Sequence, residues 1–164
     1  MSRNITQFLS CSVVGGYAVG LHGFPRYTGD IDFFVAVTEP NARRLIAVFE
    51  AFGFGDIGLQ AEDFLQPDFV VEIGREPRKI QVLTGIDGVE FGECNERRTE
   101  IDYEGLRMKF IGLPELLRNK EATGRNKDRI DIEALTGDNR EPEPRQSPPF
   151  QIDNHDEKWD HPTE

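Results

Sequence analysis

The sequence predicts an α/β or α+β fold: a small mixed sheet with flanking helices and a helical C-terminal portion. Two observations lead to this prediction. Apolar runs of strand length alternate with stretches of helical periodicity over residues 9–135. Glycines and prolines separate most of these segments, as they do at turns and helix ends. The length of 164 residues favours a single domain and suffices for an ordinary hydrophobic core.

The predicted strands are short apolar or alternating runs. They lie at residues 9–14, 33–37, 69–74, 79–84, 97–101 and 106–110. The second run continues a strand that already carries Asp30 and Asp32. Pro77 separates the third run from the fourth, and this tight connection predicts an antiparallel hairpin. The last two runs are predicted to pair with each other around Gly105.

Helical periodicity marks the remaining predicted elements. They lie at residues 17–22, 41–52, 113–122 and 125–135, with a helical turn at 61–65. Gly53 and Gly124 stand where two of these helices are predicted to end. Pro114 fits the first turn of the helix that starts at 113. Residues 89–94 are predicted to form either a short helix or an edge element.

Composition narrows the class of protein. The net charge of −11 argues against nucleic-acid binding over the whole surface, but leaves room for a local basic groove. The apolar runs fall short of a membrane span, and no signal peptide opens the chain, so a cytoplasmic protein with no membrane partner is expected. Cys11 and Cys94 fit no metal-binding spacing and are interpreted as reduced, buried thiols.

The last part of the chain has a different character. Residues 138–164 hold five prolines, eight acidic and three basic residues, and no helical period. This composition predicts a disordered or loosely packed segment. The sequence is therefore divided into a folded domain, residues 1–137, and an acidic, proline-containing tail, residues 138–164.

Two glycines and two aspartates suggest the chemistry of the chain. Gly15 and Gly16 follow the first predicted strand, where glycine allows close backbone approach and a helix N-terminus offers N–H groups to phosphate. Asp30 and Asp32 are two residues apart in a strand, so their side chains share one face, about 6–7 Å apart along the strand. Two such carboxylates can share a divalent cation or hold two. A phosphate-binding element and a metal-binding element are thus joined by one short connection.

Each feature has an ordinary explanation, because Gly-Gly commonly forms a turn and Asp-x-Asp is frequent by chance. Together and in this order, they resemble the nucleotidyltransferase superfamily that includes DNA polymerase beta. The chain is similar more narrowly to the small bacterial and archaeal members, the minimal nucleotidyltransferases and the related abortive-infection type toxins. The segments that carry this resemblance are Val14-Gly15-Gly16-Tyr17-Ala18-Val19, Leu21-His22-Gly23, Pro25-Arg26 and Thr28-Gly29-Asp30-Ile31-Asp32. The resemblance covers residues 11–135.

The resemblance implies a catalytic metal site. Asp30 and Asp32 would bind Mg²⁺ or Mn²⁺, and a third carboxylate on a neighbouring strand completes such sites in the family. The corresponding segment here is residues 80–84, in which Gln81 stands at the expected acid position. An amide can offer its carbonyl oxygen to a metal but cannot act as a base near neutral pH. Glu72, one strand earlier, is the alternative third ligand, and its ordinary interpretation is an exposed strand glutamate.

The C-terminal helical segments, residues 116–120 and 124–131, also match the abortive-infection type members. The resemblance implies that Lys120 faces a triphosphate and that Arg125 and Lys127 add positive charge to the same cleft. Asp128 and Asp131 would then orient these cations. The alternative is a solvated amphipathic helix with ion pairs three and four residues apart.

Three residues around the carboxylates have open interpretations. Thr28 lies close enough to assist a phosphate or a metal-bound water, although a turn-forming hydroxyl is the ordinary interpretation. Arg26 either touches phosphate or pairs with a neighbouring acid. His22 is interpreted as a structural histidine in preference to a catalytic base.

The expected function is metal-dependent transfer of a nucleoside monophosphate from an NTP to a hydroxyl acceptor. The acceptor is left open between an RNA end, a protein side chain and a small molecule. One alternative is a catalytically impaired protein of the same fold that binds a nucleotide or a partner, because Gln81 replaces the third acid. Another is a toxin-like member that acts on RNA and has a separate antitoxin.

Overall fold

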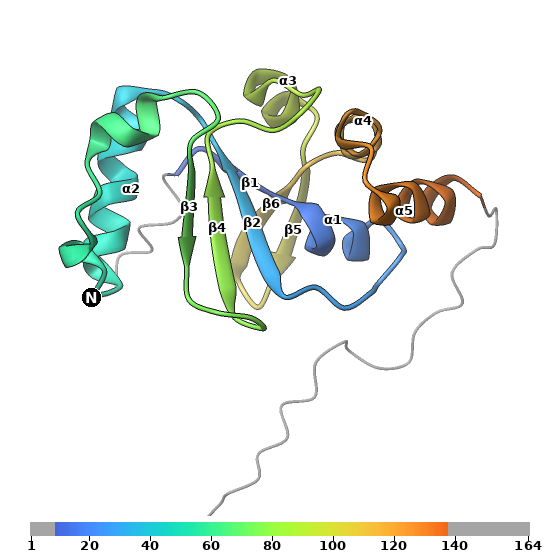
Figure 1. Ribbon diagram of the computed structural model, residues 1–164, viewed down its shortest axis with the longest axis horizontal. Coiled ribbons are helices and arrows are strands. Elements are labelled where there is room, and N and C mark those ends of the chain that lie inside the picture. The colour runs from blue at the N-terminus through green and yellow to red at the C-terminus, as the bar shows by residue number, and fades with distance from the viewer. Residues whose placement is uncertain (1–8, 138–164) are drawn as a thin grey trace, which may run out of the picture.

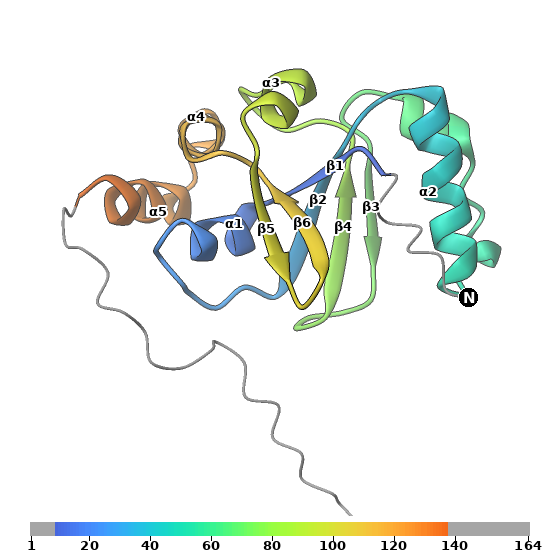
Figure 2. The ribbon, with the colours of Figure 1, turned by 180° about the vertical axis from the view of Figure 1, so that it is seen from behind.

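The computed structural model describes residues 9–137 and shows a six-stranded mixed sheet with helices on both sides (Figures 1 and 2). Its order is β3-β4-β2-β1-β6-β5. The strands are β1 (Cys11–Val14), β2 (Asp30–Val35), β3 (Val70–Ile73), β4 (Lys79–Leu83), β5 (Thr99–Tyr103) and β6 (Leu106–Phe110). This architecture confirms the predicted fold class. The predicted acidic tail, residues 138–164, and residues 1–8 of the predicted domain lie outside the described residues.

Strand pairing agrees with the predicted hairpins. β3 pairs antiparallel with β4, and β5 pairs antiparallel with β6. In the centre of the sheet, β2 is antiparallel to β1 and parallel to β4, whereas β1 and β6 run parallel. Short hairpins join β3 to β4 and β5 to β6, whereas the antiparallel pair of β1 and β2 is joined through α1.

The helices follow the predicted periodicity with small shifts at their ends. They are α1 (Gly15–Leu21), α2 (Glu39–Ala51), α3 (Phe91–Glu96), α4 (Leu113–Thr123) and α5 (Asn126–Thr136), with 3₁₀ turns η2 (Gly55–Ile57) and η3 (Ala61–Leu65). α1 begins directly at the glycines, two residues earlier than predicted. α2 begins before Pro40 because proline is well accommodated in a first helical turn, where its missing N–H is not needed. The helix alternative for residues 89–94 is the one observed, as α3.

Two apolar clusters hold the helices to the sheet. Figures 1 and 2 show α2 on one side of the sheet and α1, α4 and α5 on the other. On the α2 side, Leu45 and Phe49 pack with Val35 and Val82 of the sheet. On the other side, Val14, Phe34 and Leu116 belong to a second cluster that joins β1, β2 and α4. Burial of this kind is the main favourable contribution to folding, at about 25 cal/mol per Å² of apolar surface.

The α2 side of the sheet is incompletely covered. A groove of about 720 Å³ lies there, and its lining runs from Phe49 and Phe52 of the α2 region to Met108 of β6. Phe33 and Val82 also line it, and these residues alternate along their strands with Asp32 and Gln81. Because neighbouring residues of a strand point to opposite faces, the groove lies across the sheet from the two aspartates. It is therefore separate from the candidate site described below.

Two further predictions can be compared with the described residues. Both cysteines are free, with Cys94 buried and Cys11 partly buried. Burial raises the pKa of both thiols, which keeps them protonated and unreactive near neutral pH. Among residues 9–137, no helix combines the length and the apolar character that crossing a bilayer requires.

Candidate functional site

Strand register gathers polar side chains on the face of the sheet opposite α2. Asp30 is paired with Lys79 and Asp32 with Gln81 across the parallel strands β2 and β4. Gln81 is paired in turn with Glu72 of β3. Because directly paired residues on adjacent strands point to the same face, these five side chains form one group, here called the polar row. The sequence prediction that Gln81 stands next to the aspartates agrees with this register.

Asp30 has a partner for each carboxylate oxygen. The hydroxyl of Thr28 donates to Asp30 Oδ1 at 3.0 Å. On the other side, Lys79 Nζ lies 3.7 Å from Asp30 Oδ2. Thr28 therefore acts in this structure as a side-chain support for Asp30. The negative charge of Asp30 is balanced by the ammonium group of Lys79 on the neighbouring strand β4.

The carboxylate of Asp32 differs from that of Asp30 in its contacts. Its Oδ1 atom is buried and has no hydrogen-bond partner among residues 9–137. Burial, together with the nearby charge of Asp30, raises the pKa of Asp32 to about 6, although Lys127, Lys79 and Arg125 act against this shift. A buried oxygen without a partner is costly, so such groups usually have a role or an unseen ligand. The unpartnered oxygen of Asp32 is the feature of this site that best fits a bound cation.

The two glycines make room for the residues of this site. Gly15 adopts a left-handed conformation with φ of +64°, and a side-chain Cβ there would overlap Asp32 Oδ2. A Cβ on Gly16 would lie 2.6 Å from the hydroxyl oxygen of Thr28. Glycine at these positions lets Asp32 and Thr28 approach the junction of β1 and α1. Sequence reasoning assigned the glycines to phosphate binding and did not foresee this packing requirement.

Gly15→Ala is expected to lower the free energy of unfolding by roughly 1–3 kcal/mol more than Gly124→Ala does. Gly124 is a matched control, because its φ of +66° is nearly the same and its Cβ would meet only a carbonyl oxygen at 3.7 Å. Both variants incur the strain of a left-handed alanine, about 1–2 kcal/mol. Only Gly15→Ala also displaces Asp32. Urea denaturation measures both losses, and equal losses would show that Asp32 moves aside without cost.

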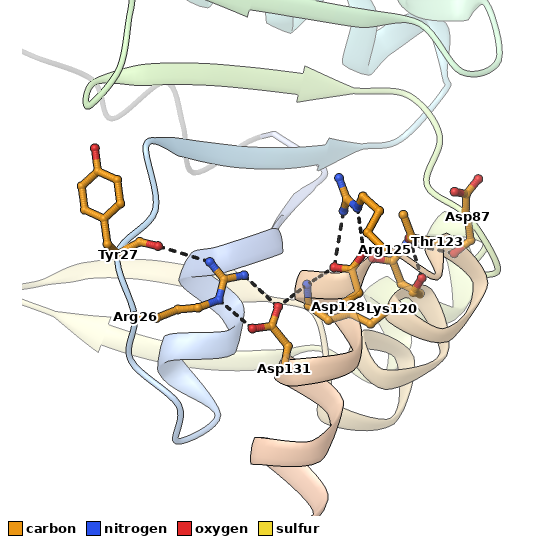
Figure 3. A network of polar contacts seen from close by, with 9 residues as sticks. Arg26, Tyr27, Asp87, Lys120, Thr123, Arg125, Asp128 and Asp131 are labelled. Carbon is orange, nitrogen blue, oxygen red and sulfur yellow. Dashed lines mark hydrogen bonds and ion pairs between the residues drawn. The ribbon is translucent and has the colours of Figure 1, made fainter.

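A second group of charges lies between α1, α4 and α5 (Figure 3). Lys120 Nζ is 2.7 Å from both Asp128 Oδ1 and Asp131 Oδ2. Arg26 reaches Asp131 through two hydrogen bonds of 2.6 and 2.7 Å, and Arg125 Nε donates to Asp128 at 2.7 Å. The Lys120 side chain is 4% exposed, and both aspartate side chains are 0% exposed. These five residues are called the α4–α5 network below.

The contacts of the α4–α5 network can be compared with the predictions for these residues. Asp128 contacts Lys120 and Arg125, two of the three cations that the resemblance implied, and Arg26 pairs with an acid, Asp131, which is one of the two interpretations left open. Burial raises the pKa of both carboxyls, but hydrogen bonds from Lys120, Arg125 and Arg26 outweigh it, so the net shift is downward. Lys120 is enclosed by the two carboxylates in this arrangement. Its predicted contact with a triphosphate therefore stays a prediction.

Arg125 and Lys127 lie near the start of α5 and act on the polar row. Both are close enough to Asp32 to lower its pKa against the effect of burial. Lys127 is exposed, and Arg125 keeps 58% of its side chain accessible while it holds Asp128. The fold thus brings the cationic start of α5 towards the carboxylates of β2. Both cations therefore remain accessible to an anionic ligand.

His22 has a structural position. Its Nε2 atom lies 2.8 Å from the carbonyl oxygen of Ile111, a hydrogen bond that connects the end of α1 with the segment after β6. This contact accounts for the ring without a catalytic role and agrees with the structural interpretation of His22.

The donor set of the polar row fits a divalent ion. Within residues 9–137, no group of three or more His, Cys, Asp or Glu side chains could hold a metal. Asp30 and Asp32 nevertheless supply two carboxylates on one face. The amide nitrogen of Gln81, which is paired with Asp32, donates to Glu72. Oxygen ligands, completed by water or phosphate, are what Mg²⁺ prefers.

Lys79 is the residue of the site that sequence reasoning did not single out. It hydrogen-bonds Glu72 at 3.2 Å and also faces Asp30. A signal was present, because Lys79 lies two residues before Gln81 and therefore shares its face of the strand.

No protein-family model matches this chain, and no curated protein matches its sequence.

Proposed function

We propose that this protein is a metal-dependent nucleotidyltransferase that moves a nucleoside monophosphate from an NTP to a hydroxyl acceptor. The observation that carries the proposal is the half-buried carboxylate of Asp32, which has an oxygen with no partner within residues 9–137 and stands beside Asp30 on one face of the sheet. The glycine junction at Gly15 and the cationic start of α5 adjoin this carboxylate. The resemblance to the DNA polymerase beta superfamily supports the same proposal.

Each residue of the site would have a separate role in the proposed reaction. Asp30 and Asp32 would hold Mg²⁺ or Mn²⁺, and Thr28 keeps Asp30 in place through its hydroxyl. An ion held by these two carboxylates would supply positive charge against the negative charge that develops on the triphosphate during transfer. Arg125 and Lys127 supply positive charge that suits a triphosphate. Gly15 and Gly16 would offer backbone N–H groups to the triphosphate beside Asp32 and Thr28, whose close approach the missing side chains permit.

One observation supports a second function on the same fold. Gln81 stands where the family places an acid, and an amide cannot take the proton of the acceptor hydroxyl. The carboxylate next to it, Glu72, accepts hydrogen bonds from Gln81 and Lys79 and so holds them in place. This arrangement favours nucleotide or partner binding with slow or no transfer.

A transfer assay with the full chain distinguishes the two functions. Each labelled NTP is incubated with the protein, Mg²⁺ or Mn²⁺, and either total RNA, a protein extract or a pool of small hydroxyl compounds. Calorimetric titration of the same NTP is done in parallel, with and without chelator. Label transfer supports the enzyme, and transfer to RNA adds support for a toxin-like role with an antitoxin. Metal-dependent binding without transfer supports the second function, and no metal-dependent binding contradicts both.

A further inference from the structure

We infer that the ammonium group of Lys79 takes the place of one metal ion in the polar row. The site would then bind one divalent ion, next to Asp32, instead of two. The inference rests on the proposed metal binding. It concerns a residue that neither the sequence patterns nor the family resemblance identified.

The position of Lys79 is that of a bridging cation. It is the first residue of β4 and is paired with Asp30 of β2. Its ammonium nitrogen lies 3.7 Å from Asp30 Oδ2 and 3.2 Å from Glu72 Oε1. The Lys79 side chain is 20% exposed, so the contacts are partly shielded from solvent. One positive charge thus connects carboxylates of two strands that flank β4.

The ammonium group of Lys79 stands between the carboxylates of Asp30 and Glu72. A divalent ion that entered between Asp30 and Glu72 would have to displace this group or remain a few ångströms from it.

The two aspartates differ in the way that this inference requires. Asp30 has Thr28 on one oxygen and Lys79 on the other. Asp32 has a buried oxygen without a hydrogen-bond partner in the part of the chain that the structure describes. The oxygen left for a divalent ion is therefore on Asp32, whereas Asp30 already shares the ammonium group of Lys79 with Glu72.

Counting bound Mn²⁺ tests the inference. Electron paramagnetic resonance of free Mn²⁺, titrated with the full chain in the absence of nucleotide, is expected to give one bound ion for the wild type. Lys79→Met is expected to gain a second ion, bound at least roughly tenfold more tightly than any second ion in the wild type. Lys79→Arg keeps the charge and is expected to bind one. Lys109→Met is the control for loss of a strand lysine, since Lys109 lines the groove on the other face.

A stability measurement covers the case in which the substitution disturbs folding. Lys79→Met is expected to have a lower thermal midpoint than Lys109→Met in chelator and to recover with Mn²⁺, because a metal replaces the lost charge. Lys79→Gln keeps a polar head group and should behave in the same way. If the wild type and Lys79→Met each bind one ion with equal affinity, the inference about Lys79 fails and the proposed function stands. The same holds if the wild type binds two ions. No bound Mn²⁺ in the wild type, with or without NTP, overturns the proposed function as well.

Discussion

Replacing Lys120 with methionine is expected to lower the free energy of unfolding by about 3–5 kcal/mol. The Lys120 side chain is 4% exposed and lies 2.7 Å from two aspartates that are 0% exposed. Methionine has a similar length but no charge, so it leaves two buried carboxylates short of a partner. Breaking a buried ion pair from one side is costly, because the remaining charge stays away from water. Urea denaturation followed by circular dichroism gives the loss.

Lys127→Met is the matched control for this experiment. Lys127 is an exposed lysine on the neighbouring helix, and its replacement is expected to change stability by no more than about 0.5 kcal/mol. A double-mutant cycle with Asp131→Asn sharpens the result, since two residues of one network lose less together than the sum of their separate losses. A loss for Lys120→Met as small as the control would show that the α4–α5 network contributes nothing net.

The same network has a defined pH dependence. The pKa values of Asp128 and Asp131 are lowered in the folded protein because hydrogen bonds from cations outweigh burial. A lowered pKa means that the folded state holds these protons less tightly than the unfolded chain does. The stabilisation is therefore fully present above the unfolded pKa, about 3.9, and is lost as the pH falls through the folded values. The difference between wild type and Lys120→Met should shrink over that acid range.

Local patterns predicted most of the fold. Alternation and apolar runs placed the strands within a few residues, because each strand has to bury at least one face. Period two also placed Asp30 and Asp32 together. The family resemblance, rather than alternation, suggested that Gln81 stands beside them, and the register of β2 and β4 agrees. The helix ends at Gly53 and Gly124 follow from glycine conformation, which is a local property.

The parts of the site that escaped prediction depend on contacts between distant segments. Arg26 and Asp131 are 105 positions apart, and only the tertiary fold brings α5 beside the loop that holds Arg26. The burial of Lys120 is also a tertiary effect, because its helix pattern alone is compatible with a solvated face. Lys79 becomes part of the site only because β4 pairs with β2 and places Lys79 next to Asp30. Sequence spacing specifies which face a residue is on, but not which charge it meets there.

Asp32→Asn is expected to abolish metal-dependent NTP binding and, in the absence of metal, to stabilise the protein above pH 6. Binding is lost because the substitution removes one of two carboxylate charges and keeps nearly the same volume. Binding energy at a charged metal ligand is large enough that affinity for Mg²⁺–NTP should fall by at least about a hundredfold. Calorimetric titration of Mg²⁺–NTP into wild type and variant measures this loss.

The gain in stability follows from the sign of the pKa shift. Burial and Asp30 raise the pKa of Asp32 from 3.8 to about 6, so the folded state holds this proton more tightly than the unfolded chain. The folded protein is therefore destabilised as the pH rises through about 6, and the effect is absent below about 4. Asparagine has no proton to lose and escapes this cost. Allowing for the partial exposure of Asp32, we expect a gain of about 1–2 kcal/mol at pH 8 and little at pH 4.

Asp30→Asn is the control that separates the two effects. Asp30 is partnered by Thr28 and Lys79, so its replacement should also impair metal binding but bring no stability gain. Added Mn²⁺ should stabilise the wild type and leave Asp32→Asn unchanged, so that their order of stability at pH 8 reverses. Equal affinity of wild type and Asp32→Asn for Mg²⁺–NTP would remove Asp32 from the proposed metal site. A loss of stability at pH 8 would show that its buried oxygen is satisfied by the protein itself, and the principal argument for a cation at this position would fail.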